Sequence, residues 1–98
     1  MRAIVLRYRV KPDVDLAALE RDIAEFVAGL GRHPATVSYR SMQLREEPRR
    51  FVHVGEFHEE HVASLQEQPF FVAFTTSLRE RCDEGPTVTA ARRVASTP

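Results

Sequence analysis

The chain has 98 residues, 43% of them hydrophobic, and its 14 basic and 14 acidic residues cancel to no net charge. A chain of roughly 100 residues buries one core and seldom divides, so residues 1–98 are expected to form one domain. A chain without net positive charge lacks the field that attracts nucleic acid or an anionic membrane. No segment reaches the roughly 18 to 20 apolar residues of a membrane helix. Neither nucleic acid nor a membrane is therefore an expected partner.

The cellular location is predicted from two further features. The single cysteine, Cys82, cannot form an internal disulfide, and the first residues lack the features of a signal peptide. Unpaired thiols are typical of reducing compartments. The sequence therefore predicts a cytoplasmic protein.

The chain begins with a strand and a helix. Apolar residues alternate over residues 2–10, which predicts a strand with one face made of Ile4, Leu6, Tyr8 and Val10. Asp13 and Asp15 are both candidate caps for a helix over residues 16–30, whose apolar side chains recur at helical spacing.

Two more strands are predicted next. The segment 35–45 is expected to form a strand with Val37 and Tyr39 on one face. A charged turn over residues 46–50 would connect it to a third strand over residues 51–58.

The last part of the chain is predicted to hold two helices and a strand. A short helix is expected over residues 59–66, and a longer one over residues 69–81 with a proline at its first position. Gly85 and Pro86 are expected to end the longer helix, and residues 87–94 to form the last strand.

This order of elements indicates an α+β fold. Short connections and right-handed crossovers favour a ferredoxin-like βαββαβ arrangement, in which a four-stranded antiparallel sheet carries both main helices on one face. The other face of the sheet, which includes Val5, would then have no cover. We expect a second copy to pack there, forming a homodimer.

Several short motifs resemble the antibiotic biosynthesis monooxygenase domain family. They are RYRVKPD over residues 7–13, Tyr39 in the second strand, FVHVGEF over residues 51–57 and PFFVAF over residues 69–74. The resemblance implies a dimeric α+β barrel with a pocket in each subunit between sheet and helices. It also implies a cofactor-independent oxygenase acting on a small aromatic or polyketide-like molecule, with neither a cofactor nor a metal.

The chain departs from this family at two functional positions. Several active members use an Asn on the first strand and a Trp near the end of the third, and this chain contains neither residue type. Leu6 and Phe57 stand at these positions. Haem-degrading members need an axial His on the longer helix, and residues 69–82 contain no His, so haem degradation is not expected.

The remaining candidates for chemistry lie on the strands and on the longer helix. His53 shares a strand face with Phe57, and a neutral His in apolar surroundings is a candidate base for a phenolic substrate. Tyr39 and Tyr8 are candidate polar partners of the substrate. The predicted substrate-binding residues are Leu6, Phe57, Phe71 and Phe74. The alternative for each of these residues is a purely structural place in the core.

Two charged groups are assigned no binding role. The segment 58–61, His-Glu-Glu-His, superficially suggests a metal site, but it is better interpreted as an exposed capping turn. Four strand arginines are expected to form surface or interface ion pairs: Arg7, Arg9, Arg92 and Arg93.

The sequence thus predicts a cofactor-independent monooxygenase with His53 as the base and Tyr39 or Tyr8 as its polar partner. Two alternatives stay open. One is a non-catalytic ligand-binding or assembly module that kept the fold and lost the chemistry. The other is a polyketide cyclase-like protein that steers a reactive substrate without oxygen.

Overall fold

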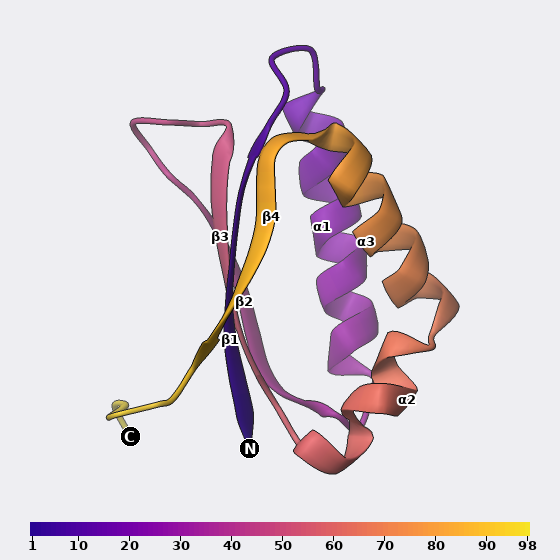
Figure 1. Ribbon diagram of the computed structural model, residues 1–98, viewed down its shortest axis with the longest axis vertical. Helices are drawn as coiled ribbons and strands as arrows, with labels where there is room; N and C mark the ends of the chain where they lie inside the picture. Colours follow the sequence, from indigo (N-terminus) through magenta and orange to yellow (C-terminus); the bar gives the residue numbers. More distant parts are fainter.

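The computed structural model describes residues 1–98, with elements in the predicted order. The strands are β1 Arg2–Val10, β2 Thr36–Gln43, β3 Arg50–Phe57 and β4 Cys82–Ala91. The helices are α1 Leu16–Gly31, α2 Val62–Gln66 and α3 Pro69–Arg81, and a 3₁₀ turn, Glu59–His61, precedes α2. Figure 1 shows two layers, with the sheet on one side and all the helices on the other. None of the helices is long and apolar enough to span a membrane.

The four strands form one antiparallel sheet in the order β2-β3-β1-β4. The predicted ferredoxin-like α+β fold is therefore confirmed. The central pair, β1 and β3, sets the faces of the sheet, because Leu6 pairs with His53 and Tyr8 pairs with Phe51. Residues paired in this way point to the same face. Here that face is the one covered by the helices.

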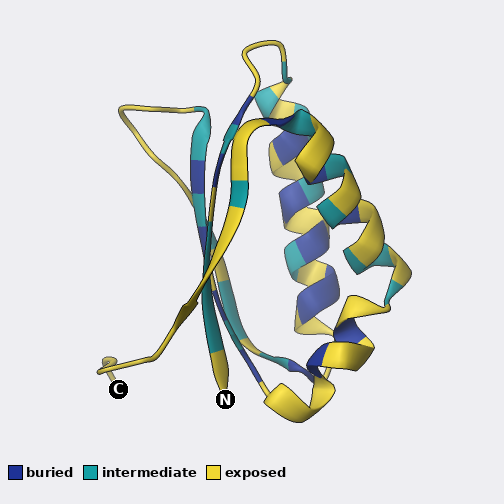
Figure 2. Ribbon diagram, viewed as in Figure 1, coloured by how far each residue is buried: buried dark blue, intermediate teal, exposed yellow.

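The core lies between the helices and this inner face of the sheet (Figure 2). Helix α1 contributes one buried stripe at helical spacing: Leu19, Ile23, Phe26 and Leu30. Its first turn is capped by Asp15, whose Oδ1 accepts hydrogen bonds from the backbone N–H groups of Ala17 and Ala18 at 3.0 and 3.3 Å. Of the two predicted caps, Asp15 is thus the one that binds the helix.

The longer helix has its predicted extent, but the role predicted for Gly85 and Pro86 is wrong. Helix α3 ends at Arg81, and β4 begins at the next residue, so Gly85 and Pro86 lie inside the strand. The pairing of β1 with β4 shifts register between Arg7 and Arg9. Gly85 lies opposite this irregularity with φ of 79°, and a Cβ on it would stand 2.7 Å from the carbonyl oxygen of Arg7. The glycine therefore marks a bulge where two backbones approach closely, not a helix stop.

The second strand also differs from its prediction. It is shorter than the expected 35–45 segment, and a register irregularity lies between Thr36 and Ser38. Val37 falls at this irregularity and is exposed, whereas Tyr39 faces the helices. The prediction that these two residues share a face is wrong, because a bulge breaks the two-residue alternation of a strand.

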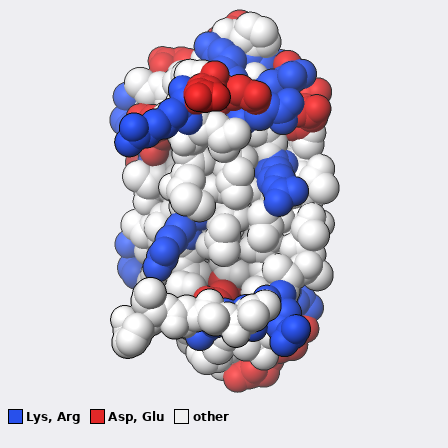
Figure 3. Space-filling view, turned by 90° about the vertical axis from the view of Figure 1, so that its left-hand side faces the viewer, with Lys and Arg blue, Asp and Glu red and all other residues white.

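The outer face of the sheet has no cover within the chain. It carries the residues that alternate with the core, among them Val5, Val54 and Met42, and Met42 is 48% exposed. Figure 3 shows this side of the molecule as a broad, largely uncharged band that holds two isolated basic groups, with the other charged groups gathered toward both ends.

Two of the four strand arginines form the predicted ion pairs, and the segment 58–61 is the predicted exposed turn. Arg9 pairs with Asp83 and Arg93 pairs with Glu56, whereas Arg7 and Arg92 form no ion pair within the chain. The segment 58–61 is an exposed turn in which the Glu59 side chain binds Arg2.

Candidate functional site

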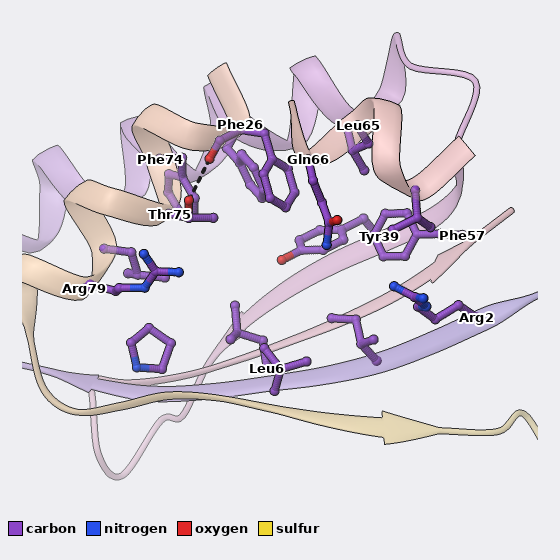
Figure 4. Close-up of a pocket in the computed structure, with 16 residues that line it drawn as sticks. Arg2, Leu6, Phe26, Tyr39, Phe57, Leu65, Gln66, Phe74, Thr75 and Arg79 are labelled. Atoms are coloured by element: carbon purple, nitrogen blue, oxygen red, sulfur yellow. Dashed lines mark hydrogen bonds between the residues drawn. The ribbon is translucent and has the colours of Figure 1, made fainter. Parts of the chain in front are cut away.

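An apolar cavity of about 250 Å³ lies between the inner face of the sheet and the helices (Figure 4). Strands β1 to β4 and helices α1, α2 and α3 all contribute to its wall. All four residues predicted to bind substrate are placed in this wall: Leu6, Phe57, Phe71 and Phe74. Cavities of this kind, largely apolar with a few polar groups, are typical small-molecule sites.

Aromatic rings form much of the wall. Phe26 stacks on Phe74 with ring centroids 4.1 Å apart and planes 14° apart, and it also contacts Phe71 and Tyr39. Phe26 and Phe74 line a second hollow as well, the cleft between α1 and α3. Phe26 was expected only as a core residue of α1. Helical spacing predicts that Phe26 lies on the buried face of α1. It does not predict that the ring lines a cavity.

A network of hydroxyl groups surrounds His53, which is fully buried. Its Nε2 lies 2.8 Å from the hydroxyl of Tyr8 and 3.0 Å from that of Ser41, and its Nδ1 lies 2.7 Å from the hydroxyl of Tyr39. The three residues predicted to carry chemistry therefore meet in one cluster. Ser41 was not predicted, although its place two residues after Tyr39 in the strand puts both side chains on one face.

Hydrogen-bond counting limits the states of this network. A neutral imidazole has one N–H and one bare nitrogen, so one ring nitrogen donates and the other accepts. If Nδ1 is bare, the Tyr39 hydroxyl donates to it, and the lone pairs of the Tyr39 oxygen are free to accept from another group. If Nδ1 carries the proton, it donates to the Tyr39 oxygen and leaves that hydroxyl proton free. Tyr39 can thus accept or donate a proton on its other side.

Burial shifts every titratable group of the network toward its neutral form. Desolvation lowers the pKa of His53 from 6.5 to about 4, because the buried imidazolium loses its hydration. Desolvation likewise raises the pKa of Tyr39 well above its usual value, and raises that of Tyr8 with a smaller contribution from Tyr39. At neutral pH the network is therefore uncharged.

His53, the candidate base, does not itself line the cavity. The Tyr39 ring forms part of the wall, and the imidazole lies behind it in the core. In Figure 4 the hydroxyl end of Tyr39 points into the cavity space between Phe74 and Leu6. The same hydroxyl holds His53 Nδ1, so Tyr39 connects the cavity with the buried imidazole.

Gly55 makes room for the Tyr39 ring. It is the β3 partner of Tyr39 across the β2–β3 pairing. A Cβ at Gly55 would stand 2.8 Å from the Tyr39 ring and 2.7 Å from the Phe57 ring, closer than real Cβ contacts. The absent side chain therefore lets both rings lie over the strand.

Cys82 is placed outside the site. It is buried directly after α3, and desolvation, followed by the nearby Asp83 carboxylate, raises the pKa of its thiol to about 11. A thiol in this state is not a nucleophile at neutral pH.

Comparison with known proteins gives a clear result for the fold only. No family model matches the chain, and no curated protein matches it by sequence. A putative antibiotic biosynthesis monooxygenase from Nitrosomonas europaea superposes with a TM-score of 0.84 at 16% identity, covering 97% of this chain and 100% of the other.

Two structures of SnoaB, a cofactor-independent oxygenase from Streptomyces nogalater, are also similar. A mutant form has a TM-score of 0.82 at 19% identity, covering 99% of this chain and 96% of the other. A second structure of SnoaB has a TM-score of 0.76 at 21% identity, covering 95% of this chain and 94% of the other. The chain therefore has the fold of the antibiotic biosynthesis monooxygenase structures, as its sequence resemblance predicted.

Proposed function

We propose that the protein is a cofactor-independent monooxygenase of this family that acts on a small, electron-rich aromatic molecule. The observation that carries the proposal is the Tyr39 hydroxyl, which faces an aromatic-walled cavity and holds Nδ1 of His53 at 2.7 Å. Tyr39 is the group that would touch the substrate. His53 is the base behind it, and Tyr8 and Ser41 hold the imidazole in place.

The proposed first step is a proton transfer over two bonds. The acidic O–H of the substrate gives its proton to the Tyr39 oxygen while the Tyr39 proton moves to His53 Nδ1. The products are a substrate anion in the cavity and an imidazolium that donates to Tyr39 and to the hydroxyls at Nε2. The low pKa of His53 keeps the base unprotonated until a substrate arrives.

The substrate then supplies the electrons. An enolisable polycyclic ketone such as anthrone presents this O–H as its enol. The resulting enolate transfers an electron to dioxygen, and the two radicals combine at the ring carbon to form a peroxide anion. The relay first returns its proton to the peroxide anion, which gives a hydroperoxide. The relay then takes the ring C–H proton as the C=O bond forms and the O–O bond breaks, and the leaving hydroxide takes that proton. One oxygen atom stays in the quinone and the other leaves as water. The apolar wall would exclude competing water from this reaction.

A cytoplasmic homodimer forms part of the proposal. The largely uncharged band on the outer sheet face includes Val5, Val54 and Met42, which a second copy would cover. A stable interface buries roughly 800 Å² on each partner, and one face of a four-stranded sheet is of that order. Charged groups at both ends of the band would then form the rim.

The test is anthrone oxidation, followed by oxygen uptake and by quinone absorbance over the uncatalysed rate. Tyr39→Phe keeps the ring and removes only the hydroxyl. Because positioned acid–base groups contribute about 10²–10⁴-fold, we expect kcat to fall by at least about 100-fold with little change in binding. Unchanged kcat in this variant would contradict the relay.

Tyr8→Phe is the matched comparison. It removes another hydroxyl from the same imidazole, but on the side away from the cavity wall, and Ser41 remains at Nε2. We expect kcat to fall by less than about tenfold, because the path from Tyr39 to His53 survives. Equal losses in the two variants would point to a structural role for both hydroxyls.

One observation favours the binding-module alternative. His53 is fully buried, and its ring nitrogens are already satisfied by hydroxyls of the fold, as in a structural core histidine. Under that alternative an aromatic ligand binds the wild type and Tyr39→Phe equally well, and neither oxidises anthrone.

A further inference from the structure

The polar groups of the cavity wall are few and belong mainly to its outer parts. Arg2, Gln66 and Arg79 are exposed residues that also line the cavity. In Figure 4 Arg79 and Tyr39 approach the cavity space from different sides, with Phe74 above this space and Leu6 below it. A ligand that reaches Tyr39 can therefore extend to Arg79 across an apolar floor.

The two arginines differ in their partners. Arg2 donates two hydrogen bonds to the carboxylate of Glu59, at 2.6 and 3.0 Å, which compensates its charge. Arg79 forms neither an ion pair nor a side-chain hydrogen bond within the chain. Other arginines without an ion pair, such as Arg7 and Arg92, lie outside the cavity wall. Arg79 is thus the one uncompensated charge in the cavity wall.

The placement of Arg79 follows from helical spacing. It lies one turn after Thr75 on α3, on the side that also brings Phe71 and Leu78 to the cavity. The Thr75 hydroxyl donates to backbone carbonyls of its own helix, so its proton is not available to bind a ligand in place of Arg79. The guanidinium therefore stands at the end of an aromatic stripe with its donors free.

We propose that the natural ligand is an aromatic acid whose carboxylate binds Arg79 while its ring system lies against Phe26 and Phe74. A planar guanidinium with free donors matches a carboxylate in a two-bond geometry, and the apolar wall beside it strengthens that pairing. This inference rests on the proposed function and specifies its substrate class. The acid would sit away from the reacting ring, with the phenolic end at Tyr39.

The test compares naphthoate with naphthamide, two ligands of nearly equal shape that differ in charge. Titration calorimetry at neutral pH would measure both with the wild type, Arg79→Gln and Arg21→Gln. Arg21 is an exposed α1 residue outside the cavity wall and is the control for loss of one positive charge. Thermal melting of each variant would check that the fold is kept.

We expect naphthoate to bind the wild type about tenfold more tightly than naphthamide, as an ion pair at a partly exposed site can give. This preference should disappear in Arg79→Gln and persist in Arg21→Gln. Arg79→Lys should keep part of it, because a lysine retains the charge without the two-bond geometry.

The outcomes separate this inference from the proposed function. Equal binding of both probes to the wild type, or an unchanged preference in Arg79→Gln, would overturn the role of Arg79 and leave the oxygenase proposal standing. Binding of neither probe would count against both, because the cavity would then hold no aromatic ligand. Oxidation of anthrone, which has no carboxylate, tests the relay without involving Arg79.

Discussion

At the scale of single residues, the most consequential feature is an uncharged His53 held by three hydroxyl groups. Its surroundings exclude water, so the imidazole keeps its bare nitrogen far below the pH at which a surface histidine would be protonated. A base with a low pKa is weak in the free protein. It becomes useful only when an anion forms beside it and stabilises the imidazolium.

This histidine predicts how stability depends on pH. Its pKa is 6.5 when exposed and about 4 in the folded protein, so between these values the unfolded chain binds the additional proton. The contribution of neutral His53 to the free energy of unfolding is fully present above pH 6.5. It is lost as the pH falls toward 4, by about 3 kcal/mol for the whole interval.

Urea denaturation of the wild type and of His53→Gln at several pH values measures this effect. We expect the stability of the variant to fall less steeply between pH 6.5 and 4, since the carboxylates shared by both proteins cancel in the comparison. Parallel curves would show that His53 does not carry the shift.

At the scale of elements, β3 combines a histidine and a glycine on one face to place the Tyr39 ring. Gly55→Ala should therefore destabilise the protein by about 1–3 kcal/mol, because the new methyl group overpacks against two rings. Displacement of Tyr39 should also lower anthrone oxidation. Gly31→Ala is the control, since its new methyl group would meet nothing within 4 Å, and it should leave stability equal or slightly higher.

The start of α1 offers a second test at this scale. Asp15→Ala removes the side chain that binds two backbone N–H groups, and should lower the free energy of unfolding by about 1 kcal/mol. Asp13→Ala removes an exposed aspartate that does not cap the helix, and should have little effect. If urea denaturation showed equal losses of unfolding free energy in the two variants, the loss of a negative charge, rather than of the cap, would be responsible.

At the scale of the whole molecule, the uncovered outer face predicts association. Val54→Arg puts a charge in the middle of this face, where desolvating it would cost more than the interface gains, so we expect a monomer. Light scattering of the wild type should give a dimer mass at micromolar concentration. Val72→Arg, at an exposed position on α3, should remain dimeric. A monomeric wild type would contradict the proposed assembly.

The parts of the fold that follow from repeating patterns could be predicted. Alternation along β1 and β3 correctly gives the face of Leu6 and Tyr8, and helical spacing gives the extent of α3 to Arg81. The bulges at Val37 and Gly85 could not be predicted, because they depend on how closely a neighbouring strand approaches.

The candidate site divides in the same way. Parity brings His53, Tyr8 and Tyr39 to one face and so predicts that they are near one another. It does not show which of them reaches the cavity, since that depends on side-chain directions after packing. Arg79 escaped prediction for a related reason. Whether a charged residue has a partner is a property of the folded surface.

The stack of Phe26 on Phe74 has a consequence for the movement of gases. These rings line both the main cavity and the cleft between α1 and α3, so they act as a partition between two compartments. A partition made by side chains opens by changes of rotamer, on a nanosecond scale in exposed residues and more slowly in packed ones. If the proposed oxidation takes place in the main cavity, such an opening would admit dioxygen, which is small and apolar, through the back of the cavity, where a polycyclic substrate would not fit. The two reactants of the proposed oxidation would arrive through different entrances and would not compete for one.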